Sequence, residues 1–573
     1  MTRLMPARWE GNLSLESSCY SGPRLPTVCD AAPRWSAITL ALASTPCINW
    51  GLNSNVKAQL TASEDQPRPN AAAGFGRFLL PSPADLIFLG LFIALSFGSL
   101  SPRLLWDADI GWHIRNGQNI LRTHTVPRKD SFSATMSGHP WYAWEWLYDA
   151  AIGWIYNRSG LNGVVFISAL VIASTLSLVF RCSLRRGGGL AVSLLLFVLS
   201  TIASSIHFLA RPHVVGWLLA VCWFSILDTN RRNGVGVRRI LFLPPLMLLW
   251  ANLHGGFVLG FVLLGIYLFA DILTLLGCPE VDERRTAAKR ASVLMVIGGA
   301  SFLASMVNPY GISLHIHVYQ YLTNRFLMQH INEFRRPDFN GIPAQAFLLM
   351  IALAGVAIVA ARGRMRWANW LLVIFAIFSG MYAARNIPFA SMLLMMVTAP
   401  LLTVKLERRT TFFAGLERWR NIELAGRIPV WPILVAVASA AICLQQGHFL
   451  GKQLMAAHFD PSRFPVQTTE LFERQGDRER IFSLDAWGGY FIYRLYPENK
   501  VFIDDRHDFY GEPYIRDYLK VIHLERGWEQ VLDQWKVRLI VMPSKARLSE
   551  ALRLLPGWKV RYADATATMF ERL

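Results

Sequence analysis

Long apolar stretches, separated by short charged or turn-forming segments, dominate the chain between residues 84 and 445. Each stretch is close to the length that an α-helix needs to cross the hydrocarbon core of a bilayer. The pattern predicts about eleven spans, at residues 84–101, 160–180, 190–209, 213–228, 239–253, 256–277, 291–307, 345–361, 367–383, 387–404 and 429–445. The expected fold class is therefore a polytopic α-helical membrane protein.

The pattern changes in the last part of the chain, residues 446–573, where short β-like runs alternate with amphipathic helical segments. Such alternation predicts a small α/β domain with a partly parallel sheet. The expected strands lie at residues 480–484, 500–503, 537–542, 558–562 and 567–571. The predicted organisation is a disordered cytoplasmic tail (1–78), a transmembrane domain (79–445) and an extracytoplasmic α/β domain (446–573).

Basic residues in the short loops predict the topology. Arginine and lysine cluster in alternate short loops, at residues 181–186, 231–239, 284–290, 362–366 and 405–409. Because such clusters stay on the cytoplasmic side, the N-terminus is expected inside. Two long loops (102–159 and 308–344) and the C-terminal domain then lie outside.

Composition agrees with a membrane protein and narrows the range of partners. The chain is 53% hydrophobic and 17% charged, with a mean hydropathy of +0.31. Its net charge of +18 lies mostly in the short loops and the tail, which indicates topology and not a nucleic-acid groove. The seven cysteines are scattered without metal-ligand spacing, so a disulfide framework is not expected.

Acidic residues follow the first span directly, in the stretch WDADIGWHIRNG (106–117). Ionisable groups at a membrane surface are costly unless they have a function. Asp107 can cap a short helix on which Asp109 and His113, four residues apart, share one face. The aromatic stretch WYAWEWLYD (141–149) adds Glu145. We expect Asp107, Asp109, His113 and Glu145 to be catalytic, with capping and surface roles as the alternative.

Basic and imidazole groups occur in the other outer segments, in ARPH (210–213), NLHGG (252–256), AARNIP (383–388) and EFRRPDF (333–339). We expect them to meet the acidic residues in one external cavity. Arginine can bind phosphate oxygens as a fork, and histidine can add hydrogen bonds. The predicted ligands of a donor phosphate are Arg211, His213, His254, Arg385, Arg335 and Arg336.

A membrane-level acidic site suits transfer of a sugar from a polyprenyl phosphate. Such a reaction needs a carboxylate base for the acceptor and positive charge for the departing phosphate. Asp107 and Asp109 can serve as the base or hold a divalent cation such as Mg or Mn. The expected partners are the lipid-linked sugar, membrane lipids and a glycan, lipid or protein acceptor, without nucleic acid.

The C-terminal domain offers candidates for the acceptor side of the site. Asp504, Asp505 and Arg506 follow a predicted strand, where α/β folds usually place ligands. Trp487 and Tyr490 lie in SLDAWGGYFI (483–492). The alternatives are a structural Asp–Arg pair and a place in the core for the two aromatic residues.

The first long loop resembles that of the GT-C class of integral-membrane glycosyltransferases. Its acidic motif, surface helix, Gly138–Pro140 turn and aromatic-rich second helix are similar to the protein O-mannosyltransferase and lipid A aminoarabinose transferase group. The resemblance implies a polyprenyl-phosphate sugar donor and a catalytic acid at Asp107 or Asp109. The chain departs from that group at 143–145, where the group often has a basic residue with two prolines.

The C-terminal part resembles, more faintly, the soluble domain of oligosaccharyltransferase catalytic subunits. The similar stretches are 483–492, 500–510 and 537–543. In that family a W-W-D motif opens the domain, whereas this chain has Asp485-Ala486-Trp487-Gly488. Sequon-directed N-glycosylation is therefore not expected.

The resulting hypothesis is a glycosyltransferase of a bacterial cytoplasmic membrane, active on the outer face. One alternative is a transporter or flippase of a lipid-linked or anionic solute, which predicts mid-membrane polar groups and internal repeats. The other is a non-catalytic membrane scaffold whose outer domain binds a partner. The polar residues gather at one end of the spans, which favours the enzyme.

Overall fold

The computed structural model describes residues 80–98, 100–232, 237–361, 365–406, 414–425, 428–476 and 478–573, all within one unit, Gly51–Leu573. The predicted disordered tail, 1–78, lies outside the described residues. The proposed domain boundaries at 78/79 and 445/446 stay predictions.

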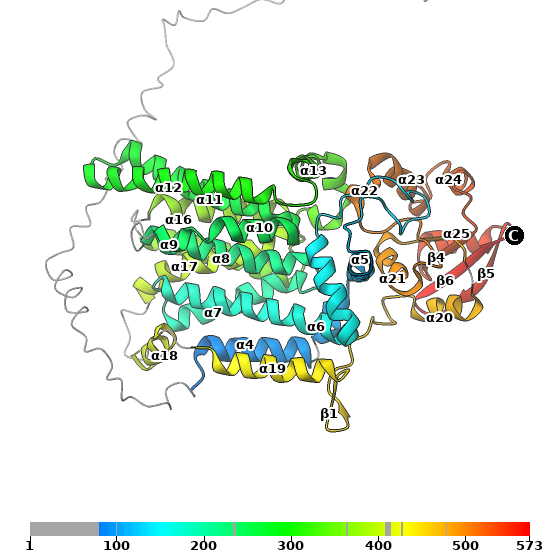
Figure 1. Ribbon diagram of the computed structural model, residues 1–573, viewed down its shortest axis with the longest axis horizontal. Helices are drawn as coiled ribbons and strands as arrows, with labels where there is room; N and C mark the ends of the chain where they lie inside the picture. The colour runs from blue at the N-terminus through cyan, green and yellow to red at the C-terminus, as the bar shows by residue number, and fades with distance from the viewer. Residues whose placement is uncertain are drawn as a thin grey trace, which may run out of the picture. The chain divides into compact units, whose positions relative to one another are not determined.

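A helix lies at each of the eleven predicted spans (Figure 1). The helices are α4 (Pro83–Ser96), α6 (Trp146–Arg185), α7 (Leu190–Ser204), α8 (Pro212–Arg232), α10 (Leu243–Leu253), α11 (Val258–Gly277), α12 (Val281–Ser305), α15 (Ile342–Ala361), α16 (Trp367–Tyr382), α17 (Ile387–Leu406) and α19 (Val430–Leu444). Within the described residues, seven helical segments are long and apolar enough to cross a membrane, and α4, α16 and α19 are shorter apolar helices. The predicted polytopic helical fold is confirmed.

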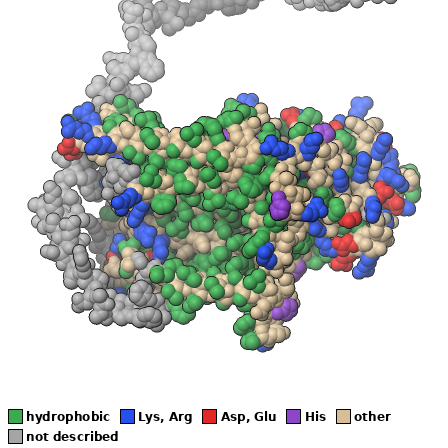
Figure 2. Space-filling model, viewed as in Figure 1, with side chains coloured by type: hydrophobic (Ala, Val, Ile, Leu, Met, Phe, Trp, Pro, Cys, Tyr) green, Lys and Arg blue, Asp and Glu red, His purple; other side chains and the backbone are tan. Residues whose placement is uncertain are grey.

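The surface of this helical part is apolar, as lipid contact requires. Figure 2 shows hydrophobic side chains spread over the helices, with charged side chains concentrated toward the two ends of the view. Val296 is 71% exposed and Val359 is 77% exposed. Exposed apolar surface of this extent marks an interaction site in a soluble protein, whereas in a membrane it faces lipid.

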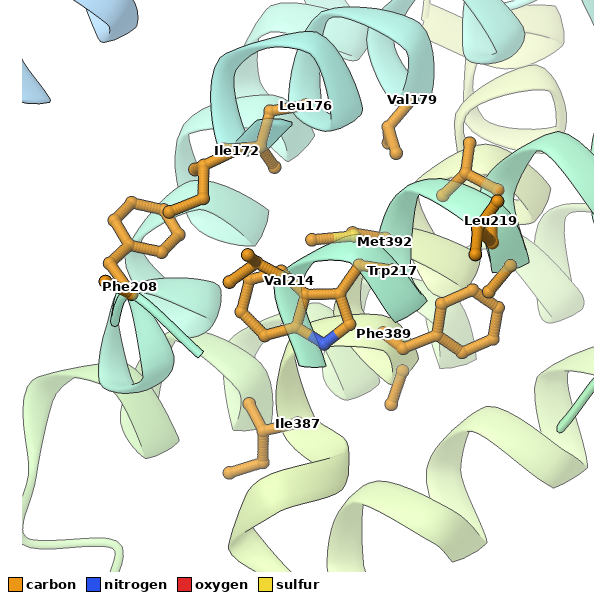
Figure 3. Packing of buried hydrophobic residues seen from close by; sticks show 14 of the residues in the cluster. Ile172, Leu176, Val179, Phe208, Val214, Trp217, Leu219, Ile387, Phe389 and Met392 are labelled. Atoms are coloured by element: carbon orange, nitrogen blue, oxygen red, sulfur yellow. The ribbon is translucent and has the colours of Figure 1, made fainter. Parts of the chain in front are cut away.

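The core of the helical part is built around α17, which packs against α6, α7, α15 and α16. Figure 3 shows the packing of buried side chains from α6, α8 and α17, among them Ile172, Leu176, Trp217, Phe389 and Met392. Trp217 and Phe389 also line the central cavity described below. Close packing therefore fixes one wall of that cavity.

The first long loop folds onto the start of α6. It contains the 3₁₀ turn η1 (Ser101–Leu105) and α5 (Asp109–Thr123). A Cβ atom at Gly153 would lie 2.6 Å from the carbonyl carbon of Gly117, so the backbones of α5 and α6 touch at glycine. Helix α6 begins at Trp146, inside the aromatic stretch 141–149, and continues into the span predicted at 160–180 after a kink at Gly160 (φ 57°, ψ −151°). Glycine adopts this backbone conformation without steric cost.

The chain between α12 and α15 forms short helices, α13 (Ile312–Thr323), α14 (Arg325–His330) and the turn η4 (Asn332–Phe334). After α17 follow α18 (Ala414–Leu424), α19 and a two-stranded hairpin of β1 (His448–Phe449) and β2 (Lys452–Gln453).

The C-terminal part has a four-stranded sheet in the order β3-β4-β6-β5. β3 (Ile481–Ser483) pairs parallel with β4 (Leu539–Pro543), whereas β6 (Ala567–Arg572) pairs antiparallel with both β4 and β5 (Trp558–Ala563). The surrounding helices are α20 (Val466–Gln475), α21 (Asp485–Leu495), α22 (His507–Tyr510), α23 (Glu512–Ile522), α24 (Trp528–Gln534) and α25 (Arg547–Leu554). The expected partly parallel sheet is present.

Two features of the C-terminal part position the site. The predicted strand at 500–503 is not a full strand: Val501 makes only isolated bridges, to Ile481 and to Ser133 of the first loop. Helix α21 packs on α5, where a Cβ atom on Gly489 would collide with the carbonyl of Ala108. Residues 504–508 therefore lie beside the acidic motif of the first loop.

Candidate active site

A cavity of about 680 Å³, called the central cavity here, is lined by residues from both long loops, from three short turns and from the C-terminal part. Ten of the predicted site residues line it: Asp107, Asp109, His113, Glu145, Arg211, His213, His254, Arg385, Asp505 and Arg506. Segments separated by hundreds of residues thus bring acids, arginines and imidazoles to one place.

Arg211 lies at the centre of a carboxylate cluster. Its guanidinium contacts an Asp107 oxygen at 2.8 Å and a Glu333 oxygen at 2.6 Å, and it forms a third ion pair with Asp109. The Asp107 carboxylate also accepts the backbone N–H of Asp109 at 2.9 Å, which holds the first turn of α5. Three carboxylates therefore share one arginine, and the cluster carries net negative charge.

Burial and charge act in opposite directions on these acids. Burial raises the pKa of Asp109 to about 6, although the nearby Arg211 lowers it. Burial also acts to raise the pKa of Glu333, but Arg211 and Arg385 outweigh it and hold that pKa below the usual range. Sequence reasoning missed Glu333, although it opens the EFRRPDF motif from which the two arginines were selected.

A buried histidine–carboxylate pair lies next to this cluster. His113 Nδ1 is 2.5 Å from one oxygen of Asp149, and the other oxygen accepts a hydrogen bond from Asn116 at 2.6 Å. His113 is 1% exposed and Asp149 is 0% exposed, yet both reach the cavity wall. Asp149 was not predicted as a site residue. The sequence feature that could have indicated it is the spacing of four residues from Glu145, which places both acids on the same side of the first turn of a helix.

Glu145 lies between two imidazoles. One carboxylate oxygen is 3.8 Å from His113 Nε2, and the other is 3.8 Å from His254 Nε2. Burial raises the pKa of Glu145, and the negative charge of Asp149 raises it further. Burial lowers the pKa of His113 to about 3 and that of His254 to about 3, so both rings are neutral at pH 7.

The orientation of His254 is set by two glycines. The backbone N–H of Gly256 donates to His254 Nδ1 at 3.1 Å, so the neutral ring carries its proton on Nε2. A Cβ atom at Gly216 would lie 2.7 Å from His254 Nδ1, and one at Gly256 would lie 2.6 Å away. Only glycine leaves room for this ring, whose Nε2–H then faces Glu145 and the cavity.

Arg385 is the arginine of the cavity that has no carboxylate partner. It lies in the 3₁₀ turn η5 (Ala384–Asn386), with its guanidinium 4.5 Å from the centroid of the Phe334 ring. Within the described residues it forms no ion pair at 4.0 Å or less. Its hydrogen-bond donors are therefore available to an anion in the cavity.

One wall of the cavity is apolar and reaches the lipid-facing surface. It is formed by α11, α13 and α16, through Val258, Leu259, Val262, Val318, Leu322, Phe375 and Tyr382. Val262, Leu322 and Tyr382 are also exposed at the protein surface. Tyr382, three residues before Arg385, places this apolar wall close to that arginine.

The C-terminal part contributes Asp505 and Arg506 to the cavity lining, and Arg506 is held by two ion pairs. Arg506 pairs with Asp504 at 2.7 Å and with Asp130 of the first loop at 2.8 Å. Its guanidinium lies 4.6 Å from the Trp141 ring centroid. Asp504 is fully buried and also accepts from Tyr510, so the Asp–Arg pair connects the C-terminal part to the first loop.

Five predicted residues do not line the cavity: Asp504, which is buried beside Arg506, and four others. Trp487 donates to the backbone of Arg463, and Tyr490 packs in the core against Phe464. Arg335 donates to the backbone of Gln329 and is exposed, as is Arg336. Amphipathic packing of α21 turns its aromatic face inward, and the loop after η4 turns both arginines outward. His213 reaches the cavity, with Nε2 2.9 Å from the backbone oxygen of His207.

Two groups of residues have the donor set for a divalent cation. They are Asp107, Asp109 and Asp505, and Asp485, Asp505 and His507, with the ligand atoms of each group within 4.8 Å of one another. Carboxylate oxygens are the ligands that Mg²⁺ and Mn²⁺ prefer. Among the described residues, one oxygen of Asp109 is buried and accepts no hydrogen bond from an N–H group, and the Asp505 carboxyl lies close enough to interact with Asp109.

No protein-family model matches the chain, and no curated protein matches its sequence. Among solved structures, an Archaeoglobus fulgidus oligosaccharyltransferase, tethered with an acceptor peptide containing the NVT sequon, is similar with a TM-score of 0.50 at 12% identity. The match covers 86% of this chain and 73% of that one. ArnT from Cupriavidus metallidurans, bound to undecaprenyl phosphate, matches with a TM-score of 0.46 at 13% identity, over 85% and 98% of the two chains.

The likeness to the oligosaccharyltransferase shows a shared fold. The expected GT-C-like architecture, with apolar helices and a small C-terminal sheet, is therefore confirmed.

Proposed function

We propose that this GT-C-like membrane protein is a glycosyltransferase that moves a sugar from a polyprenyl-phosphate donor to an acceptor lipid, glycan or protein. The observation that carries the proposal is the arrangement of the central cavity. Arg385, which forms no ion pair within the described residues, lines the same cavity as an apolar wall and a cluster of carboxylates. We place the reaction on the extracytoplasmic face of a bacterial cytoplasmic membrane, because the basic short loops lie at the opposite helix ends.

The donor lipid fits the apolar side of the cavity. The polyprenyl chain would lie along α11, α13 and α16, and its phosphate would reach Arg385 and the Nε2–H of His254. Arg211 was predicted to bind this phosphate as well. Its guanidinium is already paired with three carboxylates, so we assign Arg211 to holding the acidic cluster in place.

The acidic side of the cavity fits the acceptor and the reacting sugar. The oxygen of the acceptor hydroxyl forms a bond to the anomeric carbon of the sugar, and the bond from that carbon to the phosphate oxygen breaks. Arg385 stabilises the charge on the departing phosphate. Asp107 and Asp109 act as base or, together with Asp505, as ligands of a divalent cation. Such a cation would supply positive charge near the reacting sugar.

The experiment is turnover of lipid-linked sugars by the purified full chain in proteoliposomes. The probes are polyprenyl-phosphate hexoses and pentoses, and the measurement is release of polyprenyl phosphate. Asp107→Asn and Asp109→Asn are expected to lower kcat by about 10²-fold or more. Asp282→Asn, at an exposed position on α12, is the matched control and should leave turnover unchanged.

Three results would contradict the proposal in different ways. Parent-like turnover in both cavity variants would remove the catalytic role of Asp107 and Asp109. Movement of intact lipid-linked sugar across the bilayer without cleavage would favour a flippase. Binding without either activity would favour a scaffold.

A further inference from the structure

The pair of His113 and Asp149 has the geometry of an oriented base. Asp149 uses both carboxylate oxygens, one for His113 Nδ1 at 2.5 Å and one for Asn116 at 2.6 Å. A carboxylate at Nδ1 fixes the tautomer in which Nδ1 carries the proton and Nε2 has a free lone pair. The Nε2 atom of His113 lies on the side of Glu145, whose carboxylate lines the cavity.

The ring of His113 cannot turn away from this orientation. The Trp112 ring stacks on it with centroids 3.6 Å apart, and Tyr148 contacts it edge-on at 5.3 Å. The glycine contact between α5 and α6 brings the Asp149 backbone against Gly117, so the pair is set by packing of two helices. Such pre-organisation lowers the cost of reaching a reactive geometry.

We infer that His113 is the catalytic base that removes the proton of the acceptor hydroxyl, with Asp149 as its positioning residue. This inference rests on the proposed function and deepens it. His113 Nε2 and the nearer Glu145 oxygen are 3.8 Å apart, too far for a direct hydrogen bond. An oxygen placed beside the line between them lies about 2.8 Å from both, so the gap can seat one hydroxyl.

The step balances as follows. The acceptor O–H bond breaks and its proton moves to His113 Nε2, while the acceptor oxygen bonds to the anomeric carbon. The bond between that carbon and the phosphate oxygen breaks, and the electron pair leaves with the polyprenyl phosphate. Asp149 stabilises the imidazolium that forms. Asp107 and Asp109, already paired with Arg211, are then left for cation binding or for stabilising positive charge on the sugar.

The charges around His113 are compatible with this role. The neighbouring titratable and charged groups are Asp109, Glu145, Tyr148, Asp149, Arg211, His254 and Arg506. Burial lowers the pKa of His113 to about 3, so the free imidazole is neutral at pH 7 but only weakly basic. Burial also raises the pKa of Asp149, while the hydrogen bond from Asn116 and the charge of Arg506 lower it. The role of His113 as base therefore depends on the orientation of the pair and on Asp149 being ionised when the proton moves. In the transition state the carboxylate of Asp149 offsets the new positive charge.

The test compares His113→Ala, Asp149→Asn and Asp149→Glu with the parent chain in proteoliposomes. His458→Ala, at an exposed histidine, is the control. The probes are polyprenyl-phosphate hexoses with water as acceptor, and polyprenyl phosphate alone for binding. We expect His113→Ala and Asp149→Asn to lower kcat by about 10²- to 10⁴-fold, with polyprenyl phosphate affinity unchanged. Asp149→Glu should recover part of the loss.

Added imidazoles separate a base from a merely structural histidine. In His113→Ala the rate of donor cleavage should rise with added imidazole, and more steeply for substituted imidazoles of higher pKa. A variant that keeps parent kcat, or a rescue that does not depend on imidazole basicity, would overturn the assignment. If His113→Ala does not fold, parent-like kcat in Asp149→Asn overturns it equally. If the parent releases no polyprenyl phosphate from any probe, the proposed function fails, and this inference with it.

Discussion

Replacing Arg211 by methionine should destabilise the protein, because three carboxylates of the cavity pair with this one arginine. Methionine keeps much of the side-chain volume and removes the charge that Asp107, Asp109 and Glu333 share. Asp109 is 3% exposed in its side chain, and Glu333, the most exposed of the three, is 27% exposed. Water can therefore replace the guanidinium only partly.

The magnitude follows from the cost of leaving buried charges unpaired. Removal of one partner of a buried ion pair typically costs about 3–5 kcal/mol of unfolding free energy. Because Arg211 lowers the pKa of Asp109, its loss should raise that pKa further above its present value of about 6. Proton uptake by Asp109 would then relieve part of the repulsion. We expect Arg211→Met to cost about 3 kcal/mol or more at pH 8 and less at pH 6.

The assay is the free energy of unfolding in mixed detergent micelles, with a double-mutant cycle. Adding Asp109→Asn to Arg211→Met should restore about 1 kcal/mol or more, because one unpaired charge is removed. Arg474→Met, which removes an exposed pair with Glu470, is the control and should change stability by less than about 1 kcal/mol. A loss below about 1 kcal/mol for Arg211→Met, additive with Asp109→Asn, would refute the reasoning.

Three further results are expected. Arg385→Ala should weaken binding of polyprenyl phosphate by about 10- to 100-fold, the value of hydrogen bonds to a charged group, and an unchanged Kd would exclude Arg385 from the phosphate site. Gly216→Ala should displace His254 and cost about 1–3 kcal/mol of stability. At Gly265 an added Cβ atom has no neighbour within 4 Å, so Gly265→Ala should change the stability by less than about 1 kcal/mol. Equal melting temperatures for the two variants would contradict the packing of His254 on Gly216. His254→Gln should lessen acid sensitivity. The folded pKa of His254 is about 3 and the unfolded value about 6.5, so its stability contribution is present above pH 6.5 and is lost toward pH 3. Between pH 7 and 5 the parent should lose up to about 2 kcal/mol more than this variant, and parallel pH curves would contradict the buried neutral ring.

The helices and the end of the bundle that carries the site could be read from the sequence because both depend on local pattern. Apolar length predicts a span, and the polar residues that end each span predict where those residues meet. The ARPH and AARNIP turns are examples, since Arg211 and Arg385 could reach one cavity only if their helices end on the same side.

The pairing of those residues could not be read in the same way. The contact of His113 with Asp149 depends on two glycines, Gly117 and Gly153, that let α5 and α6 touch. The ion pair of Arg211 with Glu333 joins residues that are 122 positions apart in the sequence. For Trp487, a helical pattern shows that one face is apolar but not which neighbour covers it. Trp487 is buried in the core, because α21 packs on helix α5 of the first loop.

Asp505 and Arg506 are synthesised after helices α4 to α19, yet they complete a cavity whose other walls begin at Asp107. A growing polypeptide therefore has all its apolar helices before it has a finished pocket. The apolar helices can therefore insert into the membrane before the cavity is complete. A chain truncated before residue 505 would keep helices α4 to α19 and lack two residues of the cavity lining.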